Sequence, residues 1–561
     1  MRKAIARLLA VLLAVAVTPV ARAEELGFLQ TDPVPADGTL RVWLQSLGSD
    51  LQALGMTLDG AYAVDGDRGF QFEPGTEIAL GLEDGSIVLQ VGGAAIDMGG
   101  GFTLTRHLSP DGTAGGVYIH ESEKDTLYCG DLTFSASGGR LRVILTIQIE
   151  DYLYGVVPYE MSDTFPLEAL KAQAVAARTY AMQRKARNAD QDYDVTDTAD
   201  DQVFKGLDAR YTLPIQAVDE TRGMVGMYNG EYAECFYCAS NGGQTALATD
   251  VWGEGDFGYL QMRDDPYDLE NPESIVRTAL VPRSAAEMDL ELYGLLLEAL
   301  AQSLQASGEL ASGEAVGFSQ VLAVEAAEPI YGGESRQYGT LRFTLQATVR
   351  RLVQEEGSDT QDLGEVETLP EPVTVSLPFY EQLRDVLGVR IGSGRYELVE
   401  VAEAEDGFTV TTRRYGHGVG MSQRGAQWMA AQYGMTYTDI LHFYYPGLTL
   451  VRKTWTEPAL TYADALPESL GYAAPRPTPA PTPAPLPVLA AGERYATVQV
   501  EGVDSTLNVR GGPSLEADVL GTLRNGQRMI IIEVLEDGAW ARMKTAEIEG
   551  YVFMDFVALE E

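Results

Sequence analysis

The sequence predicts an α+β protein: a large mixed region of strands with a central cleft-lining helix, then a small all-β barrel at the C-terminus. Short β-branched runs separated by glycine turns fill residues 39–149, which is the pattern of strands. A long alanine-rich helical pattern starts at Pro166, a residue suited to the first turn of a helix. Near the other end, residues 493–561 contain about five short strands with Gly and Asn-Gly turns.

The first residues form a targeting segment rather than part of the fold. Three basic residues precede the short apolar run LLAVLLAVAV, and Ala21-Arg22-Ala23 then supplies a small-x-small cleavage pattern. The apolar run is too short to span a bilayer comfortably. We therefore expect residues 1–23 to be a signal peptide and the mature protein to be secreted and extracytoplasmic.

Length and charge limit the domain count and the class of partner. The chain has 561 residues and a formal net charge of −42, and a length of this order predicts roughly three or four domains. Phosphate binding needs a cationic surface, so the charge argues against nucleic acid as a partner. It also disfavours anionic lipid headgroups. A neutral or weakly charged polymer is the better expectation.

The most informative stretch joins a lone carboxylate to the predicted helix. Glu160 lies in the short apolar loop VVPYEM, and the helix that follows carries Lys171, Gln173 and Arg178 among small side chains. Apolar neighbours desolvate a carboxyl group and raise its pKa. On a helical wheel, Lys171 and Arg178 share one border of the alanine stripe, and Gln173 lies on the opposite border. The pattern predicts a general acid at Glu160, backed by the two helix cations.

Two further segments follow along the chain. Residues from about 270 to 407 read as an insertion, with an acidic amphipathic helix around 285–304 and strand-like pieces. We interpret it as an elaboration of the same domain, because a strong pattern resumes from Tyr415 to Gly447 with a glycine-rich turn, a helix and an aromatic strand end. Residues 458–492 form a proline-rich linker, whose core is expected to be a polyproline II spacer of roughly 40 Å.

Four blocks in order carry a family resemblance. They are IEDYLYGVVPYEM with PLEALKAQAVAARTYA, then DVTDTADDQVFKG, then CASNGGQTALATDVWGEGDFGYL, and finally GHGVGMSQRGAQWMA with DILHFYYPG. Together they resemble the stage II sporulation protein D family, which also includes the amidase enhancers. The resemblance makes residues 24–457 a catalytic region that contains the insertion. Through LNVRGGPS and Trp540, residues 493–561 resemble the bacterial SH3 family.

The first resemblance implies a peptidoglycan lytic transglycosylase. Such an enzyme cleaves the bond between N-acetylmuramic acid (MurNAc) and N-acetylglucosamine (GlcNAc) in glycan strands stripped of peptides, during sporulation or wall remodelling. The 6-hydroxyl of MurNAc closes a 1,6-anhydro ring, so one protein carboxylate can serve first as acid and then as base. The family's glutamate falls on Glu160. The reaction requires no cofactor, and the SH3 domain would bind wall peptides or glycan.

Family position also implies residues that bind substrate. These are Lys171, Gln173, Arg178, Ser240, His417, Ser422 and Gln423. A histidine between glycines, as in the GHG motif, is poor core filler, and the glycines let a ligand approach closely. The competing interpretations are structural: Lys171 and Arg178 snorkel from the edge of a core helix, and Ser240 belongs to a plain turn between strands.

The two cysteines in CFYC leave alternatives open. Cys235 and Cys238 are spaced as half a structural zinc site, and no second ligand pair at the usual spacing follows. In a regular strand their sulfurs would point to opposite faces. Zinc, a disulfide and reduced thiols are the three alternatives. The chain has only 3 cysteines, too few for a scaffold held by disulfides.

A non-enzymatic function competes with the transglycosylase. An amidase enhancer binds the wall and stimulates a separate peptidoglycan amidase, which would then be a partner of this chain. Both kinds of protein share the same blocks, so the resemblance alone does not separate them. Glu160 together with Lys171, Arg178 and His417 favours the enzyme. Either protein would work in the cell wall or between forespore and mother cell.

Overall fold

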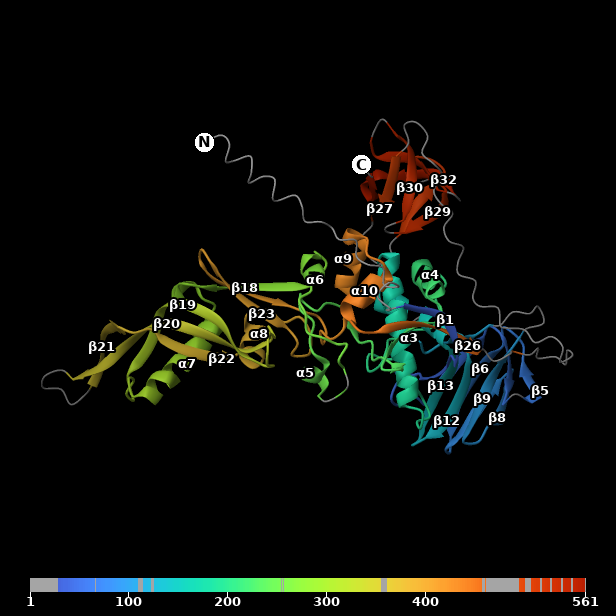
Figure 1. The fold of residues 1–561 in the computed structure, drawn as a ribbon, viewed down its shortest axis with the longest axis horizontal. Coiled ribbons are helices and arrows are strands. Elements are labelled where there is room, and N and C mark those ends of the chain that lie inside the picture. Colours follow the sequence, from blue (N-terminus) through green and yellow to red (C-terminus); the bar gives the residue numbers. More distant parts are fainter. Residues whose placement is uncertain are drawn as a thin grey trace. The chain divides into compact units, whose positions relative to one another are not determined.

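The computed structural model describes two parts of the chain. The described residues are 29–456, 460 and 494–559. Within these ranges the gaps are 66, 109–114, 123–125, 254, 256, 355–360, 500–505, 515–516, 525–526, 536–537 and 546–547. The signal peptide expected at residues 1–23 and nearly all of the linker predicted at 458–492 lie outside them. The chain divides into a large unit with strands β1 to β26 and a C-terminal unit with strands β27 to β33 (Figure 1). No helix within the described ranges is long and apolar enough to cross a membrane.

The strands predicted before residue 149 form two sheets, which confirms that part of the prediction. The seven-stranded sheet has the order β14 (Val195–Thr196), β2 (Thr39–Trp43), β13 (Arg140–Gln148), β12 (Asp131–Ser137), β9 (Gly101–His107), β4 (Ala61–Val64), β5 (Asp67–Phe72). The six-stranded sheet has the order β11 (Leu127–Tyr128), β10 (Val117–Ile119), β3 (Ala53–Leu58), β6 (Glu77–Glu83), β7 (Ser86–Val91), β8 (Ala94–Asp97).

Alternating burial explains why these two sheets pack on each other. Along β13 every second residue, from Leu141 to Ile147, is buried, because successive side chains of a strand point to opposite faces. Strands β12 and β13 lie against β7 and β6 of the other sheet. The chain leaves β13 directly into α1 (Ile149–Tyr154) and then α2 (Val157–Glu160). The segment that carries Glu160 therefore follows directly after a strand of these two packed sheets.

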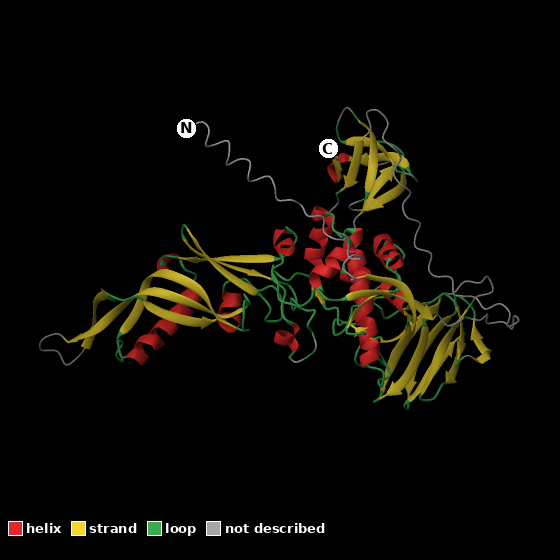
Figure 2. Ribbon diagram, viewed as in Figure 1, coloured by secondary structure: helices red, strands yellow, loops and turns green. Residues whose placement is uncertain are grey.

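The predicted alanine-rich helix is confirmed as α3 (Leu167–Arg187), with Pro166 at its N-cap position. Every residue from Ala169 to Met182 except Lys171 is buried, so the helix is central rather than amphipathic. Figure 2 shows helices gathered around it. Its small side chains allow close packing against β15 (Met224–Tyr228), α9 (Gln423–Tyr433) and α10 (Tyr437–Tyr444). Strand β16 (Glu231–Tyr232) also contacts α3 and ends a four-stranded sheet of the order β1 (Leu29–Asp37), β26 (Thr449–Thr456), β15, β16. Helix α4 (Thr212–Glu220) belongs to the same region of the chain.

The insertion has a hydrophobic core of its own. Its elements are β18 (Val276–Pro282), α7 (Leu290–Ser307), β19 (Ala315–Pro329), β20 (Tyr338–Gln354), β21 (Gln361–Thr368), β22 (Val373–Pro378), η4 (Phe379–Leu383), α8 (Arg384–Val386), β23 (Leu398–Ala404) and β24 (Gly407–Arg413). Helix α7 buries Leu292, Leu296, Leu300 and Leu304, which recur every four residues, against β19 and β22. The helix begins at Leu290 rather than near residue 285, because Asp289 caps it and Ala285–Glu287 is a separate 3₁₀ turn.

The C-terminal unit is all-β, as predicted. Its seven strands have the order β29 (Val519–Arg524), β28 (Thr506–Arg510), β32 (Glu549–Phe553), β31 (Trp540–Lys544), β30 (Arg528–Val534), β27 (Arg494–Val498), β33 (Val557–Leu559). All neighbouring strands whose register is defined run antiparallel. Trp540 is only 7% exposed and its ring meets Phe553 edge-on at 5.3 Å. The fold class is therefore α+β with a separate small β unit.

Candidate active site

Glu160 is the last residue of α2 and lies among apolar neighbours. Val156 and Val157 are fully buried, and Met161 is 1% exposed. The backbone N–H of Val203 lies 3.4 Å from the carboxyl Oε1, and Nε2 of Gln423 lies 3.4 Å from Oε2. The hydroxyl of Tyr237 is a third hydrogen-bond partner. The carboxyl group is thus approached by three neutral donors from three separate segments.

Burial decides the protonation of this carboxyl group. Desolvation is the largest influence and raises the pKa of Glu160 above its ordinary value, although the three hydrogen bonds oppose it. Two of these bonds are long at 3.4 Å, so they stabilise the ionised form only weakly. No cation is among the causes of the shift. The raised pKa agrees with the prediction from the apolar loop.

Tyr237 and Gln202 complete the surroundings of Glu160, and the sequence reasoning did not single them out. Nε2 of Gln202 donates to the Tyr237 hydroxyl at 3.0 Å, and the Tyr152 hydroxyl donates to Oε1 of Gln202 at 3.3 Å. With its oxygen occupied by Gln202, the Tyr237 hydroxyl has its own hydrogen available for Glu160. Gln202 lies in the block DVTDTADDQVFKG, and Tyr237 lies between the two cysteines. The available signal was the position of Gln202 inside this block and of Tyr237 directly before the block that begins at Cys238.

His417 is connected to Glu160 through Tyr237. Burial is the main cause that lowers the pKa of His417 to about 4, and its ring hydrogen-bonds to the backbone of Tyr237. Nδ1 of the neutral ring accepts the N–H of Val419 at 3.0 Å, so the proton lies on Nε2. The glycine that follows is required, because a Cβ on Gly418 would lie 2.6 Å from the Nε of Arg414 and its φ is +76°.

Ser240 and Ser422 both donate to one buried carboxylate. The hydroxyl of Ser240 lies 2.8 Å from Oδ1 of Asp268, and that of Ser422 lies 2.5 Å from Oδ2. The backbone N–H of Asn241 also donates to Oδ2, at 2.8 Å. Ser422 additionally caps α9, whose first residue is Gln423. Asp268 therefore fixes the turn at Ser240 to the helix end that presents Gln423 to Glu160.

A second buried acid adjoins this carboxylate. Oδ2 of Asp265 accepts from the Tyr444 hydroxyl at 2.6 Å and from Nδ2 of Asn241 at 2.7 Å. Burial and the neighbouring Asp268 raise the pKa of Asp265 to about 6.

The two serines that were predicted to bind substrate are buried: Ser240 is 1% exposed and Ser422 is fully buried. Their hydroxyl groups both contact Asp268, and substrate binding by either residue stays a prediction.

The structure corrects the expectation that Lys171 stands beside Glu160. Its Nζ lies 2.6 Å from carboxylate oxygens of both Glu168 and Glu220. Gln173 on the same helix is fully buried, and its amide has no hydrogen-bond partner among the described residues. Substrate binding by these two side chains stays a prediction.

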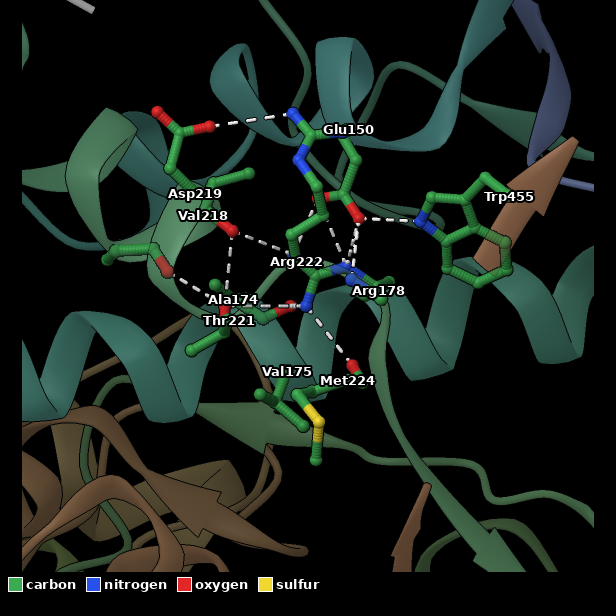
Figure 3. A network of polar contacts seen from close by, with 12 residues as sticks. Glu150, Ala174, Val175, Arg178, Val218, Asp219, Thr221, Arg222, Met224 and Trp455 are labelled. Carbon is green, nitrogen blue, oxygen red and sulfur yellow. Dashed lines mark hydrogen bonds and ion pairs between the residues drawn. The ribbon is translucent and has the colours of Figure 1, made fainter. Parts of the chain in front are cut away.

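Arg178 likewise pairs with another carboxylate, that of Glu150 (Figure 3). Its Nη2 lies 2.7 Å from Oε2 of Glu150, and the guanidinium is fully buried. Glu150 also accepts from Nε1 of Trp455 at 2.6 Å and from the backbone N–H of Gly223 at 2.9 Å. A guanidinium without exposed surface cannot contact a polymer in this arrangement. Arg178 instead joins α3 to α1 and β26 through a buried ion pair.

The cysteines of the CFYC segment are buried free thiols. Burial raises the pKa of Cys235 and of Cys238 to about 12 each. Cys238 lies in β17 (Tyr237–Cys238), which runs parallel to β25 (Met421–Ser422). In the part of the chain that the structure describes, no three His, Cys, Asp or Glu side chains are grouped as a metal site.

Two family models match segments of this chain. Residues 137–228 match the stage II sporulation protein, and residues 505–558 match the bacterial SH3 domain. The first segment contains Glu160 and its helix α3, and the second contains Trp540. Both resemblances drawn from the sequence motifs are therefore confirmed for these segments.

Three relatives extend this similarity. The chain is 30% identical over 317 residues to the amidase enhancer of Bacillus subtilis (strain 168), covering 53% of this chain and 40% of that protein. It is 28% identical over 316 residues to stage II sporulation protein D of the same organism, covering 54% and 74%. It is 42% identical over 127 residues to an uncharacterised protein of Brachyspira hyodysenteriae, covering 22% and 34%. The chain thus spans less than half the length of the first and third of these relatives.

Proposed function

We propose that this chain is an extracytoplasmic lytic transglycosylase that cleaves MurNAc–GlcNAc bonds in the glycan strands of peptidoglycan. One observation carries the proposal: the carboxyl group of Glu160 is half-buried, has a pKa raised by desolvation and is approached by three neutral donors. A carboxyl group with a raised pKa is suited to general acid catalysis. The similarity to stage II sporulation protein D supports the substrate class.

The proposed reaction needs only one protein carboxyl group. Glu160 protonates the bridging oxygen while the bond from this oxygen to C1 of MurNAc breaks, and GlcNAc leaves with the proton. The resulting carboxylate then accepts the proton of the MurNAc 6-hydroxyl as that oxygen bonds to C1. The product carries a 1,6-anhydro ring, and Glu160 has regained its proton for the next cycle.

Tyr237 and Gln423 stabilise the ionised form of Glu160 in the middle of this cycle. Each directs a neutral donor at the carboxylate, which lowers the cost of holding a buried charge. Because Nε2 of Gln202 donates to the Tyr237 hydroxyl, that hydroxyl keeps its hydrogen directed to Glu160. His417 stays neutral above a pKa of about 4, so it orients Tyr237 rather than exchanging protons.

The test uses purified protein and peptide-free glycan strands, with products identified by mass spectrometry. We expect 1,6-anhydro ends with the unmodified protein and none with Glu160→Gln, which keeps the shape but cannot donate an acidic proton. Glu298→Gln is the matched control, since Glu298 is an exposed residue of α7 in the insertion. Reducing ends in place of anhydro ends would indicate a hydrolase and contradict the proposal.

The second candidate function is an amidase enhancer, favoured by the similarity to the B. subtilis protein of that name. In that case the chain would bind peptidoglycan and stimulate a separate amidase without cleaving glycan. The two candidates make opposite predictions for Glu160→Gln. An enhancer keeps its stimulation of the amidase in this variant, whereas a transglycosylase loses its product.

The C-terminal unit is proposed to hold the polymer. A bacterial SH3 segment joined by the proline-rich linker would bind wall peptides or glycan. Tethering the two units raises the local concentration of cleavable bonds around Glu160. Removing residues 475–561 should therefore weaken binding to intact walls more than it weakens cleavage of short, soluble strands.

A further inference from the structure

We infer that Trp252 forms a sugar-stacking subsite next to Glu160, a role that rests on the proposed function and adds a binding residue to it. Trp252 ends the short helix α5 (Ala248–Trp252), labelled in Figure 1. Its side chain is 46% exposed, which is unusual for the largest apolar side chain. The proposed reaction does not involve this side chain.

An aromatic cluster packs against the indole of Trp252. Its ring centroid lies 4.3 Å from that of Phe236 and 4.9 Å from that of His417. Phe236 in turn meets Tyr180 edge-on at 6.0 Å and Phe257 at 6.3 Å. The indole is therefore supported on one side, and a supported ring loses little conformational freedom when a ligand covers its other side.

The cluster is joined directly to the partners of Glu160. Phe236 immediately precedes Tyr237, and His417 bonds the backbone of Tyr237, whose hydroxyl contacts Glu160. Both sets of groups also lie against one turn of α3. Gln202, the partner of Tyr237, donates to the carbonyl of Ala177 at 3.3 Å, and Phe236 packs on Tyr180. A polymer with one bond at Glu160 would have a neighbouring ring near Trp252.

The chemistry of the surface favours a pyranose ring as ligand. The C–H face of a sugar packs on an indole while its hydroxyls stay in water, which suits an aromatic residue with one exposed face. Phe236, Phe257 and His417 are only partly exposed, so Trp252 is the most exposed ring of this cluster. A protein partner would need about 800 Å² on each side.

The test measures steady-state cleavage of peptide-free glycan strands by Trp252→Ala and Trp252→Phe in the full chain. We expect Trp252→Ala to raise KM about tenfold with kcat within about twofold, because stacking away from the reacting bond is uniform binding. Trp252→Phe should recover most of the loss. Tyr433→Ala is the matched control, since Tyr433 is 50% exposed but outside the cluster, and its KM should not change.

A binding measurement separates failure of the subsite from failure of the catalytic proposal. Glu160→Gln and the double variant Glu160→Gln with Trp252→Ala are titrated with the same strands by calorimetry. Weaker binding of the double variant supports the subsite even if no variant cleaves glycan. Equal binding of the two, or an unchanged KM for Trp252→Ala, overturns it. Loss of amidase stimulation in Trp252→Ala with unchanged glycan binding would also overturn it, in favour of a protein-docking residue.

Discussion

Removing Glu150 should cost the large unit about 3–5 kcal/mol of unfolding free energy, the usual cost of leaving a buried charge without its partner. Arg178 would keep contacts only with backbone carbonyls such as that of Met224, at 3.1 Å, and with Thr221 at 3.5 Å. The guanidinium is 0% exposed and the Glu150 side chain 3%, so water cannot replace the carboxylate.

Urea titrations of Glu150→Ala, of Arg178→Met and of the double variant Glu150→Leu with Arg178→Met provide the assay. Both single variants should lower the transition midpoint of the large unit strongly, whereas the double variant should recover most of the loss, since it leaves no unpaired charge. Glu220→Ala is the matched control, because Glu220 belongs to a more exposed pair with Lys171 and should cost less than about 1 kcal/mol.

The reasoning would be refuted if Glu150→Ala cost no more than the control. It would also be refuted if Arg178→Met left stability unchanged but weakened glycan binding. The second result would support the polymer-binding role of Arg178 that its family position implies.

The ion pair of Arg178 and Glu150 also predicts how stability depends on pH below neutrality. Arg178 keeps the pKa of Glu150 lowered in spite of burial, so its stabilisation is present above the ordinary glutamate pKa and is lost as pH falls through the lowered value.

Three more expectations concern the groups behind Glu160. Asp265 has a pKa raised from 3.8 to about 6, so between these values the folded state holds a proton that the unfolded state has lost, and stability falls as pH rises. Asp265→Asn should remove that slope in thermal unfolding measured across this range. Asp268→Asn should reduce kcat about tenfold and leave KM nearly unchanged, because Asp268 positions the α9 end that carries Gln423; an unchanged kcat would contradict this. Cys238 should resist a thiol reagent in the native protein, since burial holds its pKa near 12; rapid labelling without urea would contradict it.

Local patterns predicted the elements whose structure depends on neighbours in sequence. Pro166 and the alanine repeats located α3, and the apolar loop located a carboxyl group with a raised pKa. The bounds of the insertion, about 270 to 407, stay a prediction, although the elements from β18 to β24 share one hydrophobic core. Its helix began later than expected, since the choice between a 3₁₀ turn and an α-helix at Ala285–Glu287 depended on capping by Asp289.

Contacts between side chains far apart in the chain could not be predicted from the sequence. A helical wheel shows that Lys171 and Arg178 share a border, but not that Glu220 and Glu150 approach them from other segments. Their distances in sequence gave no signal for these ion pairs. The same limit hid Tyr237, whose importance depends on a hydroxyl that meets Glu160 across 77 positions of chain.

The central claim is tested most directly by counting 1,6-anhydro ends as a function of pH for the unmodified protein and for Glu160→Gln. Cleavage should be constant in mild acid and fall as pH rises through a pKa above 4.5, the ordinary glutamate value, because the proton given to the glycosidic oxygen is lost. The variant should form no such ends at any pH. Anhydro product from the variant, with the same decline as pH rises, would show that another group supplies the proton.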